Sequence, residues 1–153
     1  MDKKYLYQDM QSKVSISKAD FEKFVDCFEL KIIGRKQKLI EEGKPNNKLY
    51  FIEEGLLFSY KMLDNGNRQV IQFAKENYWI SDLYSFFSGS KALFTIQALE
   101  FCKVWGFSKT DFDKICEQYP EMETLYRSPA RSNIFRLTAN DFEYRHSTKV
   151  LRN

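Results

Sequence analysis

Three glycines recur at nearly constant spacing through the middle of the chain, and each follows a short apolar segment. They are Gly43, Gly55 and Gly66, which are separated by 12 and 11 residues. Short apolar segments between turns at this spacing are typical of antiparallel strands in a sandwich or barrel, and not of alternating strand–helix units. Asn65 and Gly66 form the strongest hairpin signal. The rhythm therefore predicts a mainly β fold.

The apolar segments around these turns give about eight expected strands. Alternation is clearest in Leu56–Leu63, where one set of alternate residues is wholly apolar and is expected to face the core: Leu56, Phe58, Tyr60 and Met62. The other expected strands are Ile32–Ile33, Leu39–Ile40, Leu49–Ile52, Gln69–Phe73, Phe94–Ala98 and Lys103–Phe107.

Helical signals lie before and after the strands. Ser17 with Asp20 three residues later is an N-cap pair, and the apolar spacing that follows predicts a helix over Ser17–Leu30. Ser108 with Asp111 repeats the same signature before a second helical pattern. We therefore expect one helix, then the strands, then further helices.

The chain divides into four expected segments. These are an N-terminal arm (1–16), a helix with the β core (17–119), a C-terminal helix (120–139) and a basic tail (140–153). The arm is expected to be either a short helix or a loose segment. Pro120 suits the first position of a helix, and Pro129 is expected to kink that helix.

Length, charge and hydropathy limit the class of protein. The 153 residues suffice for one domain with a sizeable core. The formal net charge of +3 gives no whole-molecule attraction to nucleic acid or to anionic membranes. The start has no apolar signal segment, and no run reaches the length of about 18 apolar residues that a membrane span needs. We expect a cytoplasmic protein.

The inventory of reactive residues argues against an enzyme and against a cofactor or metal. His146 is the single histidine, and it falls in the expected tail. Metal enzymes on jelly-roll folds need two or three histidines with a carboxylate. The three cysteines, Cys27, Cys102 and Cys116, are widely spaced and are expected to be reduced thiols. No nucleophile elbow or phosphate-binding glycine loop is present.

Residues 76–102 combine an aromatic edge, a polar loop at Ser88–Lys91 and a β-like run. In a β-rich chain this order of features could build a small pocket with backbone amides facing a ligand. The alternative is that the aromatic side chains simply fill a core. The candidate ligand-binding residues are Trp79, Ser81, Asp82, Leu83 and Tyr84, with Thr95 and Gln97 from the strand that follows.

Several segments in a fixed order resemble the sensor domain of the Crp/Fnr family of bacterial regulators, in the branch common in Bacteroidetes-type genomes. The matching segments are Ile40–Gly43, Phe51–Gly55, Asp64–Gly66, Ile71–Phe73, Trp79–Phe86 and Ala98–Glu100. The resemblance implies a jelly-roll-like β-roll of the cyclic-nucleotide-binding type, flanked by helices, and a helix after Pro120 that pairs two subunits. Residues expected in that pairing are Met122, Leu125, Tyr126 and Phe135.

The resemblance also implies a cassette that binds the phosphate of a cyclic nucleotide, and here the cassette departs from the family pattern. Ser81 replaces a glycine, and Asp82 is one methylene shorter than the family's glutamate. The family's arginine falls at Ala92 or Leu93, neither of which can pair with a phosphate. The missing charge-assisted contact is worth about 1.5–3 kcal/mol. We therefore expect no tight binding of cAMP or cGMP.

Family regulators continue into a winged helix-turn-helix domain, for which the last 14 residues here are too few. This predicts a stand-alone sensor, a truncated regulator or a remnant, and the alternative is a dimeric protein-interaction module or a truncated transcription regulator with no ligand. DNA contact would be weak and would need the basic tail or a partner chain. The expected partners are thus a small or nucleotide-like ligand and a second copy of the chain.

Overall fold

A computed structural model of the chain describes residues 3–122 and 150–151. The helices are α1 (Lys4–Val14), α2 (Lys18–Phe24), the short 3-10 helix η1 (Val25–Cys27), α3 (Leu83–Ser88) and α4 (Lys109–Gln118). The strands are β1 (Glu29–Ile33), β2 (Lys38–Ile40), β3 (Lys48–Glu54), β4 (Leu57–Met62), β5 (Arg68–Ala74), β6 (Trp79–Ile80), β7 (Thr95–Ala98), β8 (Cys102–Ser108) and β9 (Val150–Leu151).

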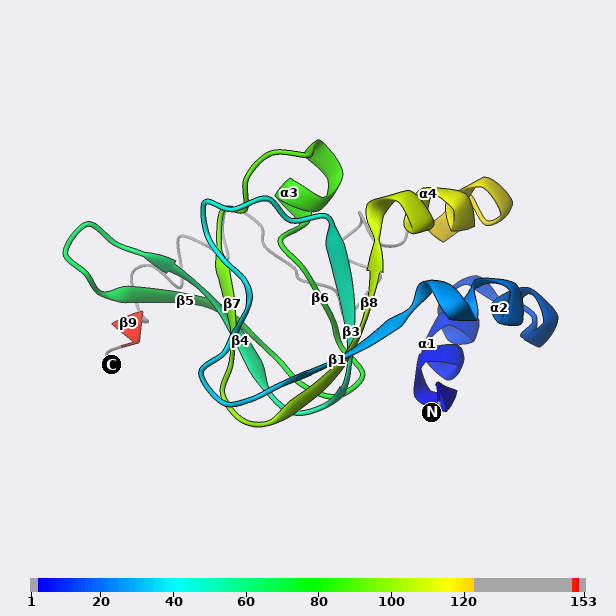
Figure 1. Cartoon of the computed structure of the whole chain (residues 1–153), viewed down its shortest axis with the longest axis horizontal. Helices are drawn as coiled ribbons and strands as arrows, with labels where there is room; N and C mark the ends of the chain where they lie inside the picture. The colour runs from blue at the N-terminus through cyan, green and yellow to red at the C-terminus, as the bar shows by residue number, and fades with distance from the viewer. Residues whose placement is uncertain (1–2, 123–149, 152–153) are drawn as a thin grey trace.

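The strands form two antiparallel sheets (Figure 1). One has the order β1-β8-β3-β6, and the other has the order β2-β7-β4-β5-β9. In both sheets, strands far apart in sequence are neighbours, as in a jelly roll. The expected mainly β roll with flanking helices is confirmed. The hairpin between β4 and β5 turns at the Asn-Gly pair, where the Gly66 amide donates to the Leu63 carbonyl at 2.9 Å.

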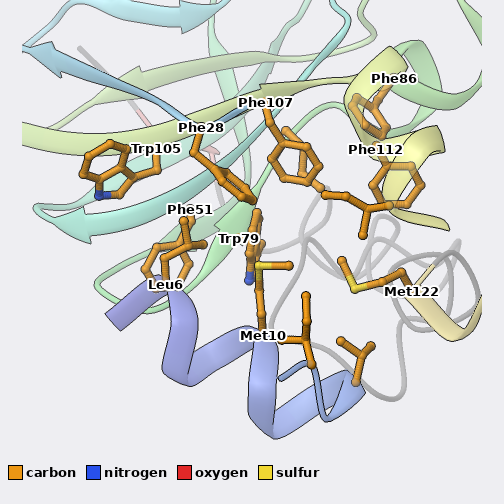
Figure 2. Packing of buried hydrophobic residues seen from close by; sticks show 14 of the residues in the cluster. Leu6, Met10, Phe28, Phe51, Trp79, Phe86, Trp105, Phe107, Phe112 and Met122 are labelled. Carbon is orange, nitrogen blue, oxygen red and sulfur yellow. The ribbon is translucent and has the colours of Figure 1, made fainter. Parts of the chain in front are cut away.

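The core has two main layers, one inside the roll and one outside it. The inner layer lies between the sheets and includes Ile52, Leu57 and Ile96. The outer layer lies between the β3–β8 side of the first sheet and the helices α1, α2 and α4 (Figure 1). Figure 2 shows Leu6 and Met10 of α1 facing the aromatic side chains of this outer layer. The N-terminal arm is therefore a packed helix over most of its length.

The expected helix over Ser17–Leu30 is too long. Its N-cap is as predicted, because the Ser17 side chain accepts a hydrogen bond from the Asp20 amide. The α-helix ends at Phe24, however, and β1 begins at Glu29. Residue Leu30 is paired with Trp105 of β8, so sheet hydrogen bonds replace helical ones at this point. Apolar spacing alone did not show where this change occurs.

The expected orientation of β4 is also wrong. Leu57, assigned to the outward set, is fully buried in the inner layer. Phe58 and Tyr60, assigned to the inward set, are buried in a separate cluster with Val70, while Met62 is 44% exposed. Because β4 is covered on both sides over its first four residues, alternation of apolar residues could not distinguish the two faces.

One of the four residues expected in subunit pairing lies in the described part of the chain. Met122 is fully buried in the outer core layer, near Phe112 (Figure 2). Its packing is therefore intramolecular in this structure, and its expected part in subunit pairing stays a prediction. Leu125, Tyr126, Phe135 and the expected kink at Pro129 lie outside the described residues.

Candidate functional site

The segment from β6 through α3 to the start of β7 forms a compact unit at one end of the roll (Figure 1). Asp82 follows β6 and is the N-cap of α3, because its side chain accepts a hydrogen bond from the Ser85 amide. A short aspartate before a helix satisfies an amide that the helix itself cannot pair. The loop after α3 then returns the chain toward Asp82. We call residues 80–95 the cassette.

The Asp82 carboxylate lies at the centre of the cassette and is fully buried. Its Oδ1 accepts hydrogen bonds from the Ser85 amide at 2.8 Å and from the Ser85 hydroxyl at 2.8 Å. Its Oδ2 accepts from the Leu93 amide at 2.7 Å and from the Phe94 amide at 3.0 Å. Both carboxylate oxygens are thus occupied by donors from two sides of the cassette, and none of the four donors is charged.

Asn46, which the sequence did not single out, connects the cassette to the turn before β3. Its Nδ2 lies 3.1 Å from the Ser81 Oγ and 3.2 Å from the Ser85 Oγ, and it lies 3.4 Å from the Asp82 carbonyl oxygen. The Ser81 hydroxyl in turn donates to the Lys48 carbonyl at 2.6 Å. The only sequence signal at Asn46 is that of a turn residue, next to Pro45.

The position expected for the family's arginine holds no cation. Ala92 is buried, and its amide and carbonyl pair with Lys44 and Gly43 of the β2–β3 loop. Leu93 is 40% exposed, and only its backbone reaches Asp82. Lys91 is exposed on the same loop. The cassette therefore presents backbone amides without the guanidinium that would balance a phosphate.

The aromatic residues at the start of this stretch lie in different surroundings. Trp79 is fully buried in the outer core layer, where its ring makes edge contacts with Phe51 and Phe107 (Figure 2). Its Nε1 donates to the Asp9 carboxylate. Tyr84 is 51% exposed. Trp79 thus packs as a core residue, whereas Tyr84 faces outward, and the expected role of either residue in ligand binding stays a prediction.

The remaining candidate residues are also engaged in internal contacts. Leu83 is half-buried and packs against the outer core layer. Thr95 Oγ1 accepts from the Glu42 amide at 3.0 Å, and Gln97 Oε1 accepts from the Tyr60 hydroxyl at 2.9 Å. The structure therefore brings Ser81 and Asp82 together with the start of β7, while Trp79 and Gln97 lie in other clusters.

A cavity of about 450 Å³ lies beside α3, between the turn before β3 and the start of α4. Its lining residues are Pro45, Asn46, Asn47, Ser85, Phe86, Phe87, Ser88, Gly89 and Lys109. None of the candidate ligand-binding residues lines it. It meets the cassette only through Asn46 and Ser85, so it is a neighbouring hollow and not the expected pocket.

All three cysteines are free thiols, and Cys102 is the buried one. Among the described residues, no three His, Cys, Asp or Glu side chains gather closely enough to hold a metal ion. Burial raises the pKa of the Cys102 thiol, which disfavours its nucleophilic thiolate form. Within the same residues, no helix has the length and apolar character that crossing a membrane requires.

Comparison with known proteins identifies one family and many similar structures. The family model described as the cyclic nucleotide-binding domain matches residues 31–119. None of the curated proteins compared with the chain matches it significantly. The family-model match begins within β1, ends just after α4 and includes the whole cassette.

Three solved structures illustrate the likeness. The regulatory domain of Toxoplasma gondii PKA with cAMP has 20% identity and a TM-score of 0.68, and the match covers 84% of this chain and 50% of that one. The sensor domain of the regulator DNR from Pseudomonas aeruginosa has 14% identity and a TM-score of 0.69, and the match covers 80% of this chain and 85% of that one. The regulatory subunit of a cAMP-independent protein kinase A from Trypanosoma brucei has 17% identity and a TM-score of 0.69, and the match covers 95% of this chain and 50% of that one.

These identities are all below 25%, so the likeness shows the fold alone. The match spans about half the length of the Toxoplasma and Trypanosoma chains.

Proposed function

Because the chain belongs to the cyclic nucleotide-binding domain family, we propose that it is a regulatory domain of Crp/Fnr type that has lost tight binding of cyclic nucleotides. The family's fold is a sensor fold, and the structural neighbours include bacterial transcription regulators and kinase regulatory domains. One neighbour is described as cAMP-bound and another as part of a cAMP-independent kinase. The same fold thus serves with and without this ligand.

The observation that carries the proposal is the state of the cassette. A cyclic phosphate needs free amide donors and a cation to balance its charge. Here the Leu93 and Phe94 amides are bonded to Asp82, and Ala92 and Leu93 stand where the family has arginine. A nucleotide would have to displace a buried carboxylate and would then face that negative charge without a guanidinium. Both effects oppose binding.

Isothermal titration with cAMP and with cGMP tests this proposal. We expect no binding at micromolar concentrations, because loss of the guanidinium contact alone costs about 1.5–3 kcal/mol, or about tenfold to 150-fold in affinity. A bacterial cAMP receptor measured in the same buffer serves as the positive control. A dissociation constant in the micromolar range or below for this chain would contradict the proposal.

The filled cassette also favours a second candidate, a dimeric interaction module that takes no ligand at this position. Dimerisation would use the segment 120–139, where the residues expected in subunit pairing are Met122, Leu125, Tyr126 and Phe135. We expect a mass of twice 18.3 kDa by light scattering. A monomer at micromolar concentration would contradict this second candidate and leave the titration result unaffected.

A further inference from the structure

We infer that the Asp82 carboxylate is a built-in substitute for a bound anion, which holds the cassette closed in the absence of any ligand. The inference deepens the proposed function, because it explains why the amides of this family's cassette would be unavailable here. It rests on the positions of four donors around one buried side chain, on the polar contacts beneath it and on the connection of the cassette to the β2–β3 loop.

The first step concerns the two sides of the cassette that Asp82 joins. Oδ1 bonds to Ser85 in the first turn of α3, and Oδ2 bonds to the Leu93 and Phe94 amides at the entry to β7. One carboxylate therefore joins the first turn of α3 to an amide 11 positions after Asp82 in the sequence. An anion held by backbone amides makes this kind of bridge, and hydrogen bonds to a charged acceptor are about twice as strong as neutral ones.

The second step concerns what keeps the carboxylate in place. Ser81, Asp82 and Ser85 are all fully buried. Asn46 donates toward both serine hydroxyls and the Asp82 carbonyl, and Ser81 donates to the backbone of β3. Buried polar groups that are fully bonded fix a single arrangement, whereas an unpaired one is costly. The serine that replaces the family's glycine thus anchors the closed cassette.

The third step concerns the loop after α3, which is fixed from a second direction. The Gly43 amide donates to the Ala92 carbonyl at 2.8 Å, and the Ala92 amide donates to the Lys44 carbonyl at 2.9 Å. An isolated β-bridge also joins Pro45 to Lys91. The loop therefore lies between Asp82 and the β2–β3 loop, and its backbone groups bond to the Asp82 carboxylate on one side and to the backbone of the β2–β3 loop on the other. No external group is needed to close it.

The regulatory consequence is a cassette that Asp82 keeps in this arrangement without a ligand. In a ligand-responsive domain, closure is driven by a molecule that binds one state better than the other. A covalently attached carboxylate is always present, so closure here would not depend on the concentration of any metabolite. Release of the cassette would require a change that removes Asp82 from its donors.

Amide hydrogen exchange, followed by NMR on the full chain, tests the inference with the variant D82A. In the unmodified chain without ligand, the Leu93 and Phe94 amides should be protected. In D82A their exchange should be about tenfold to 150-fold faster, because a hydrogen bond to a charged acceptor is lost. Adding formate, which fits the space of the deleted carboxylate, should restore protection relative to chloride at equal ionic strength.

The control variant is D111A, which removes a carboxylate in the first turn of α4 that is hydrogen-bonded to Ser108 and not to the Leu93 or Phe94 amides. It should leave the Leu93 and Phe94 amides protected and should show no formate effect. If D82A does not fold, D82N is the second variant, because it keeps the shape of the side chain. Its amide group places an N–H donor against either the two Ser85 donors or the Leu93 and Phe94 amides. Exchange at whichever amides face that N–H group should still accelerate. Unprotected amides in the unmodified chain, or equal exchange in both folded variants, would overturn the inference.

The proposed function and the internal-anion inference are contradicted by different results. Binding of cAMP to the unmodified chain would contradict the proposed function whatever the exchange rates are. Exchange that is indifferent to Asp82 would contradict the internal-anion inference even if no nucleotide binds.

Discussion

Replacing Trp79 by alanine is expected to lower the free energy of unfolding by about 3–5 kcal/mol. The side chain is fully buried in the outer core layer, and its ring contacts Phe51 and Phe107. Truncation would leave a large cavity under α1 and would remove the donor to Asp9. Urea denaturation followed by circular dichroism measures the change.

Tyr84 provides a matched control from the same aromatic stretch. It is 51% exposed, so Tyr84→Ala should change the free energy of unfolding by less than about 0.5 kcal/mol. The variant Trp79→Phe should fall between the two, because it keeps most of the ring contact and loses the hydrogen bond. Equal effects of the two alanine substitutions would show that Trp79 is not the core residue described above.

The turns of the fold could be predicted from the sequence because turn chemistry is local. Asn65 and Gly66 specify a tight hairpin whatever the rest of the chain does, and the β4–β5 hairpin is found there. The N-caps at Ser17 and Ser108 were predictable for the same reason, since each serine accepts from the amide three residues later. These features depend on three or four adjacent residues only.

Features that depend on contacts between residues far apart in the sequence could not be predicted from local patterns. The helix after Ser17 stops at Phe24, the 3-10 helix η1 follows, and from Glu29 the chain pairs with β8, where Leu30 lies opposite Trp105. The inward face of β4 depends on which sheet covers Leu57, and both of its faces are buried there. Local apolar spacing carries no information about such long-range pairing.

The candidate site likewise combines residues that the sequence indicates with partners that depend on the three-dimensional fold. Ser81 and Asp82 were identified from the resemblance, but their partners are backbone amides and a turn asparagine, which no sequence pattern marks. Trp79 and Tyr84 look equivalent in sequence, yet one lies under α1 and the other faces outward. Aromatic residues next to a cassette are therefore poor guides to its lining.

Replacing Gly55 by alanine is expected to lower the free energy of unfolding by about 2–5 kcal/mol, the sum of backbone strain and overpacking. Gly55 lies between β3 and β4 with a φ of +110°, which side chains rarely adopt. An added Cβ would lie 2.4 Å from the Cys102 Sγ and 2.6 Å from the Phe101 carbonyl oxygen. Urea denaturation of the purified variant measures the loss.

Gly66→Ala separates the two contributions, because Gly66 has a φ of +85° but nothing within 4 Å of an added Cβ. Only the left-handed backbone conformation is then penalised, and the expected loss is about 1–2 kcal/mol. Removing the Cys102 Sγ in the double variant Gly55→Ala, Cys102→Ala should recover little, since the Phe101 carbonyl oxygen belongs to the backbone and cannot rotate away. If Gly55→Ala costs no more than Gly66→Ala, the close approach of the β3–β4 turn to the start of β8 is not as described, and the inner layer of the roll must be packed differently at this end.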